Sequence, residues 1–166
     1  MKFLHELIDY LHGDKTYEVR KYIMTQCSKT TDNNKGKFWE EVLGKAMKSH
    51  TKLLEHNAHY RDFDDDSDAK FATYYHRDNG MGAFEASVSN IRNKIGHLRI
   101  CLCVPGDNYH KLHFLLIPKE AYEPYLKGSN ALKFGLSPRG KPTGKLAKYL
   151  CSFQEVTQPL VDKKTK

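Results

Sequence analysis

The sequence predicts a mixed α/β domain in which helices flank a central sheet. Three observations lead to this class: an amphipathic helical stripe over 38–55, an acidic turn leading into a strand-like run between 62 and 76, and two apolar runs at 98–104 and 111–117. At 166 residues and 39% hydrophobic composition, the chain can bury one core and is too apolar for a disordered protein.

The charge balance favours a polyanionic partner. The formal net charge is +7 and the pI is near 9.1. Acidic residues gather at 62–68, so the remaining surface is more basic than the total suggests. A basic body attracts a phosphate backbone, and one acidic spot can hold a cation. A soluble protein that is merely basic is the alternative.

The cysteines indicate a reducing compartment. Cys27, Cys101, Cys103 and Cys151 do not have the spacing of a disulfide framework, and no secretory signal is visible. No run reaches the ~18 apolar residues that a membrane-spanning helix needs. We therefore expect a cytoplasmic protein without membrane attachment.

The N-terminal third is predicted to be helical. Apolar spacing predicts helices over 2–12 and 17–27, a polar loop over 29–37 that includes Lys35, and a long helix over 38–55. The apolar stripe of the long helix is interrupted around 49–51 and ends at Glu55.

The acidic segment is the strongest candidate for chemistry. It holds five carboxylates in seven residues, from Asp62 to Asp68, and a strand-like run follows. On a strand, Asp68 and Lys70 project from the same face and Ala69 turns into the core. A carboxylate there can hold a hard cation such as Mg²⁺, and the ammonium can orient an attacking water. Asp62 is the first choice for a second carboxylate, Asp64 the next, and Asp66 remains open.

Two other interpretations of this segment stay open. Asp64, Asp66 and Asp68 have the spacing of a calcium loop, but Ala69 stands where an EF-hand needs glycine and Tyr75 where it needs glutamate. The segment can also be an acidic, solvated turn that binds no metal.

Asp62 together with Asp68-Ala69-Lys70 resembles the signature of the PD-(D/E)XK nuclease superfamily, although Arg61 stands in place of its proline. The chain looks like a small type II restriction endonuclease. The resemblance implies a restriction-endonuclease-like mixed central sheet and Mg²⁺-dependent cleavage of double-stranded DNA, for which we expect Mn²⁺ to substitute. It also implies a homodimer, in which 1–36 form a dimerisation arm, 37–127 the catalytic core and 128–166 a basic arm and helix. Glu55 is the candidate for a helix-borne acid that joins the site.

Other DNA contacts are expected outside the acidic segment. A short helix over 89–96 would display Arg92 and Lys94 to phosphates, and Asn90 and Asn93 to base edges. The loop-rich stretch 128–145 would form a flexible, DNA-wrapping arm that carries Arg139 and Lys141. Lys35 is a further candidate. Each of these segments can equally be a solvated surface.

The remaining elements complete the predicted sheet. A strand over 83–88 follows the Asn79-Gly80 turn, and 98–104 and 111–117 form a central hairpin buried on both faces. Short helices are expected at 119–127 and 146–153, and a disordered tail at 162–166.

Two metal alternatives rest on histidine and cysteine. Cys101 and Cys103 with His110 and His113 invite a zinc site, but their one-residue gap favours buried thiols. The second alternative is a ββα-metal nuclease that uses His76 or His97 as its general base.

The sequence therefore predicts a metal-dependent endonuclease. A junction resolvase or repair nuclease, for which substrate shape decides cutting, is the alternative within the same chemistry. A nucleic-acid-binding protein without catalysis is the alternative outside it.

Overall fold

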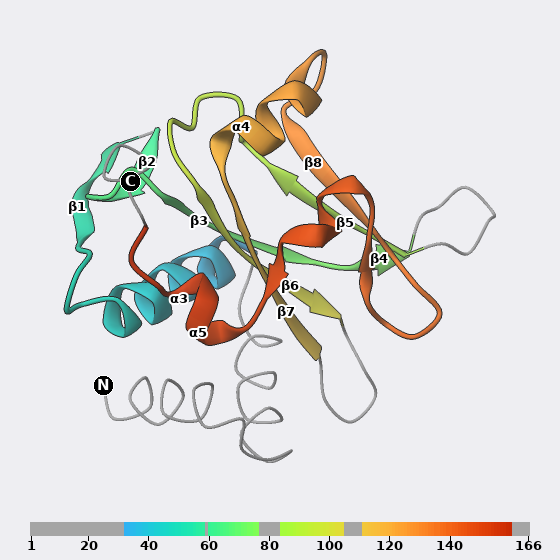
Figure 1. Cartoon of the computed structure of the whole chain (residues 1–166), viewed down its shortest axis with the longest axis horizontal. Helices are drawn as coiled ribbons and strands as arrows, with labels where there is room; N and C mark the ends of the chain where they lie inside the picture. The colour runs from blue at the N-terminus through green and yellow to red at the C-terminus, as the bar shows by residue number, and fades with distance from the viewer. Residues whose placement is uncertain (1–31, 59, 77–83, 105–110, 161–166) are drawn as a thin grey trace.

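The computed structural model describes residues 32–58, 60–76, 84–104 and 111–160, without side chains at 32–34 and 56–58 (Figure 1). The fold is mixed α/β and mostly sheet. The helical elements are α3 (Asp32–Ala46), α4 (Lys119–Tyr122), η1 (Glu123–Leu126), η2 (Lys145–Tyr149) and α5 (Phe153–Val156). The strands are β1 (Leu53–Ala58), β2 (Arg61–Phe63), β3 (Asp68–Thr73), β4 (Tyr75–His76), β5 (Phe84–Ser89), β6 (Leu98–Val104), β7 (Lys111–Ile117), β8 (Ala131–Leu136), β9 (Pro142–Thr143) and β10 (Leu150–Cys151).

Two four-stranded sheets make up most of the fold. The first has the order β10-β7-β6-β3, in which β3 runs parallel to β6 and the other neighbours are antiparallel. The second has the order β4-β5-β8-β9 and is antiparallel throughout. β1 and β2 form a separate antiparallel pair. The chain enters the first sheet at β3 and crosses into the second at β4, so the two sheets share one continuous segment.

Strand β6 lies at the centre and is buried on both faces. Its odd-numbered face packs under α3 and α5, where Cys101 and Cys103 meet Trp39 and Phe153. Its even-numbered face packs against β5 and β8 in a second apolar cluster, which includes Ile100. In Figure 1, α3 and α5 lie together on one side of this sheet, while β5 and β8 lie on the other. The predicted hairpin of 98–104 and 111–117 is confirmed, because a continuous apolar run suits a strand covered twice.

The long helix is shorter than predicted and begins earlier. α3 covers part of the predicted loop 29–37 and ends at Ala46, after which a turn is closed by backbone bonds from His50 and Thr51 to the Met47 carbonyl. The stretch after it forms β1, where Leu53 pairs with Phe63. The polar residues at 49–51, which interrupt the apolar stripe, therefore lie just beyond the end of the helix and not within it.

Three predictions for the second half of the chain are wrong. Residues 90–97 form turns and not a helix, because the amides of Ile91 and Arg92 donate to the Asn130 side chain. The expected flexible arm at 128–145 contains β8 and β9 and pairs with β5. The expected last helix at 146–153 is divided among η2, β10 and the start of α5.

Some predictions are confirmed and others lie outside the described residues. β5 is the predicted return strand, and α4 with η1 is the predicted short helix near 119–127. The helices expected at 2–12 and 17–27 and the tail at 162–166 are outside the described part. Within the described part, no helix is long and apolar enough to cross a membrane.

Candidate active site

Strand β3 positions the central acid and lysine. The Asp68 amide donates to the His97 carbonyl, which starts the parallel pairing with β6. The ammonium of Lys70 lies 3.7 Å from Oδ2 of Asp68. Ala69 is buried on the opposite face, against the cluster under α3. The pleat of the strand thus has the predicted effect of placing the two charged side chains together.

The turn before β3 brings Asp62 to the same place. The amides of Asp62 and Phe63 both donate to the Ser67 carbonyl, at 3.1 Å, which folds β2 back over the start of β3. Oδ2 of Asp62 accepts a hydrogen bond of 2.9 Å from the Ala69 amide. Of the acids considered as partner for Asp68, the structure brings Asp62 beside the Asp68–Lys70 pair.

The other three aspartates of the segment serve the turn. Asp64 is exposed and accepts a 2.9 Å hydrogen bond from the Lys52 amide. Asp66 has a φ of 70° and pairs with Arg61 at 2.7 Å. Asp64 and Asp66, considered as supporting acids, therefore bind other groups: Asp64 accepts from the residue before β1, and Asp66 pairs with Arg61 of β2.

Asp65 anchors an arginine that the sequence did not single out. Arg99 is fully buried on β6, and its guanidinium donates to Oδ2 of Asp65 at 2.8 Å and to Oγ of Ser67 at 3.0 Å. It also donates to the carbonyls of Val156 and Gln158. Burial raises the pKa of Asp65, but hydrogen bonds from Ser67 and Arg99 outweigh this and leave it below its ordinary value. This network ties the turn to the sheet and to α5.

A second lysine reaches Asp68 from the segment after β5. The ammonium of Lys94 lies 3.1 Å from Oδ1 of Asp68, an ion pair, whereas no other side chain in the described part of the chain pairs with that oxygen. Lys94 was expected to contact phosphate from an exposed helical face. Its side chain is instead only 10% exposed and turned to the carboxylate.

The protonation of the cluster departs from ordinary values. Burial, and next the charge of Asp62, raise the pKa of Asp68 to about 6, although Lys94 and Lys70 oppose the change. Burial lowers the pKa of Lys70, and Lys94 adds to this effect against the attraction of Asp68. Such groups can exchange protons closer to neutral pH than their free counterparts.

Glu40 is the helix-borne acid of this site, and the sequence analysis missed it. It lies in the middle of α3, which packs along β3. Burial, then the charges of Asp62 and Asp68, raise its pKa to about 7. Glu55, the acid predicted for this role, is exposed on β1. The available signal was the break at 49–51, which places Glu55 beyond the helix.

The remaining candidates for DNA contact lie apart from the acids. Asn90, Arg92 and Asn93 are exposed in the turns after β5, and Arg139 and Lys141 are exposed at the turn between β8 and β9. Lys35, near the start of α3, is half-buried beside β3.

Within the described part of the chain, no three side chains of His, Cys, Asp or Glu lie close enough together to hold a metal ion. Cys101 and Cys103 are buried in the core, and His113 contacts the Gly140 carbonyl, so the buried-thiol interpretation fits these positions better than zinc. His76 is exposed and packs edge-on against Phe84.

The chain was compared with known proteins. Neither family models, nor curated proteins, nor solved structures gave a match to it.

Proposed function

We propose that this chain is a Mg²⁺-dependent endonuclease that hydrolyses phosphodiester bonds of double-stranded DNA, with a restriction-endonuclease-like fold and the role of a type II restriction enzyme. One observation carries the proposal. Asp68 and Lys70 share a face of β3 with 3.7 Å between their charged groups, and the turn brings Asp62 against the intervening Ala69.

The residues present fit a magnesium ion. Mg²⁺ favours hard oxygen ligands and is commonly held by one or two carboxylates, with waters and substrate phosphate completing the shell. Asp62 and Asp68 supply two carboxylates, and the buried Oδ1 of Asp68 is neutralised by an ammonium and not by a backbone donor. A carboxylate oxygen that pairs with a lysine ammonium can hold a small cation instead.

Each side chain has a distinct task in this proposal. Asp62 and Asp68 would hold the metal, which when bound supplies positive charge to the scissile phosphate and the leaving oxygen. Lys70 orients the attacking water. Glu40, with a pKa of about 7, is suited to accept a proton from that water at neutral pH. Lys94, which pairs with Asp68, would be able to contact the incoming phosphate if a metal were held by that carboxylate.

Cleavage of supercoiled plasmid tests the proposal. Purified protein with Mg²⁺ or Mn²⁺ should produce linear DNA, and EDTA should prevent it. Asp68→Asn and Lys70→Met should each lower the rate by about 100-fold or more, since both remove groups that act on the reacting atoms. Asp64→Asn is the matched control, because it neutralises an exposed acid of the same turn and should leave the rate unchanged. Full activity of either site variant would refute the assignment.

Two further measurements define the class of nuclease. We propose a homodimer, because two sites related by a two-fold axis would cut both strands of a palindrome. Sedimentation of the protein with and without DNA measures this. Discrete fragments from linear DNA support a restriction enzyme, whereas a preference for branched DNA supports a junction resolvase or repair nuclease. Salt-sensitive binding without cleavage in either metal would leave a non-catalytic DNA-binding protein.

A further inference from the structure

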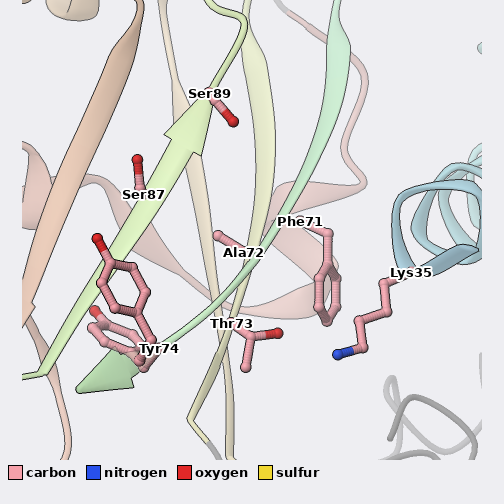
Figure 2. A pocket seen from close by; sticks show the side chains of 8 residues that line it. Lys35, Phe71, Ala72, Thr73, Tyr74, Ser87 and Ser89 are labelled. Atoms are coloured by element: carbon pink, nitrogen blue, oxygen red, sulfur yellow. The ribbon is translucent and has the colours of Figure 1, made fainter. Parts of the chain in front are cut away.

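A groove lies along the open edge of β3 and begins at Phe71, the residue after Lys70. It has a volume of about 410 Å³, which is within the range of ~300–1,000 Å³ typical of small-ligand sites. The segment 71–75, which covers the end of β3 and the start of β4, forms one side, and β5 forms the other with Ser87 and Ser89. Figure 2 shows Lys35 reaching in from α3 beside Phe71 and Thr73.

The groove presents hydrogen-bond donors and positive charge. Lys35 contributes an ammonium, and Thr73, Ser87 and Ser89 contribute hydroxyls. None of the described side chains that line it is acidic. The ring of Phe71 offers an apolar surface next to the ammonium (Figure 2). A ligand with anionic oxygens and an apolar portion would complement these groups.

The backbone of β3 adds further donors. The Asp68 amide donates to the carbonyl of His97, just before β6, and the Tyr74 amide donates to that of Cys103 in β6. Alternate residues of a strand direct their amides to opposite edges. The amides of Phe71 and Thr73 therefore face the other edge, which pairs with no strand among the described elements. Amides at such an edge bind phosphate oxygens as readily as side-chain hydroxyls do.

The groove and the active site are parts of one path. Lys70 and Phe71 are consecutive on β3, and Glu40 and Lys35 lie on the same helix, α3. A strand of nucleic acid whose scissile phosphate lies at Asp68 and Lys70 would continue along β3 into the groove. The acids then act on one phosphate and the groove receives the next.

We infer that this groove binds the sugar–phosphate backbone of the cleaved DNA strand at the nucleotide adjacent to the scissile phosphate. The inference rests on the proposed function for the direction of the strand. Lys35, Thr73 and the β3 amides contact phosphate oxygens, and Phe71 packs against the sugar. Ser87 and Ser89 close the groove from the β5 side.

Equilibrium binding tests the inference without cleavage. A fluorescein-labelled 16-base-pair duplex is titrated in EDTA at several salt concentrations, and anisotropy gives the dissociation constant. Lys35→Ala removes the ammonium, and Ser89→Leu obstructs the groove at an exposed position on β5. Lys48→Ala and Ser49→Leu are matched controls, because both residues are exposed in the turn that follows α3.

The groove variants should weaken binding by about 3- to 10-fold each, as expected for one lost contact. Lys35→Ala should also reduce the slope of log K against log salt by about 0.9, which is the value for one phosphate. The controls should bind as the unchanged protein does. Melting temperatures, measured by circular dichroism, establish that all variants are folded.

The outcomes separate this inference from the proposed function. Groove variants that bind like their controls overturn the inference, even where the protein cleaves DNA. Weakened binding in a protein that never cleaves supports the groove as a DNA site and refutes the nuclease. An unchanged protein that binds no duplex at low salt overturns both.

Discussion

Lys94 and Asp68 form an ion pair of 3.1 Å between Nζ and Oδ1, with side chains that are 10% and 2% exposed. One residue follows β5 and the other begins β3, so the pair joins two sheets. A buried carboxylate next to a lysine is stable only while the charges remain balanced. Substitutions in β3 or in the segment after β5 should therefore both affect the candidate active site.

Lys94→Met should destabilise the protein by about 1–3 kcal/mol at pH 8, because among the described residues it leaves the buried carboxylate with Lys70 as its one ammonium partner. Urea unfolding measures the loss. Asp68→Asn and the double variant complete a double-mutant cycle, in which we expect a coupling energy of about 1 kcal/mol or more. Additive effects would show that the pair does not interact.

Glu40→Gln should change how stability depends on pH. The pKa of Glu40 rises from 4.5 to about 7 on folding, so the native state holds a proton that the unfolded state releases. Its contribution is fully present below pH 4.5 and is lost as the pH rises through 7. The variant should therefore be more stable than the unchanged protein at pH 8, by about 1–2 kcal/mol, and nearly equal at pH 4.5. Urea unfolding at both pH values checks this, and a constant difference would contradict it.

Asp65→Ala should be among the most damaging substitutions in the acidic segment. It would leave the guanidinium of Arg99 buried without a counter-charge, at a cost of about 3–5 kcal/mol. Asp66→Asn is the matched control, because its pair with Arg61 is half-exposed and asparagine tolerates the positive φ. Thermal unfolding should show a large decrease in melting temperature for Asp65→Ala and little change for Asp66→Asn. Equal drops would mean that Arg99 finds other partners.

Gly96→Ala should disturb the site from outside it. A Cβ at this position would lie 2.7 Å from the carbonyl carbon of Asp66, so the segment that carries Lys94 must shift relative to the turn. We expect the free energy of unfolding to fall by about 1–3 kcal/mol and DNA cleavage to be reduced. Gly36→Ala, inside α3 with open space around the new Cβ, should be neutral or stabilise by up to about 1 kcal/mol. Unchanged stability and cleavage in Gly96→Ala would show that the turn can shift without a free-energy cost.

Much of the architecture could be predicted from local patterns. The bounds of β6 and β7 follow from two dense apolar runs, and the shared face of Asp68 and Lys70 follows from the pleat. The boundary of α3 was misplaced because apolar residues on both sides of the break at 49–51 continue the helical spacing. Segments 90–97 and 131–136 were mistaken because their backbone partners, Asn130 and β5, are distant in the sequence.

Sequence alone determined the α/β class, the central hairpin, and the shared face of Asp68 and Lys70. All of these depend on periodicity or on a short turn. Tertiary structure alone decided which aspartates serve the turn, that Glu40 and not Glu55 joins the acids, and that Lys94 balances Asp68. The reason is physical: a carboxylate takes its role from the charges and donors packed around it, and these come from α3, β6 and the segment after β5.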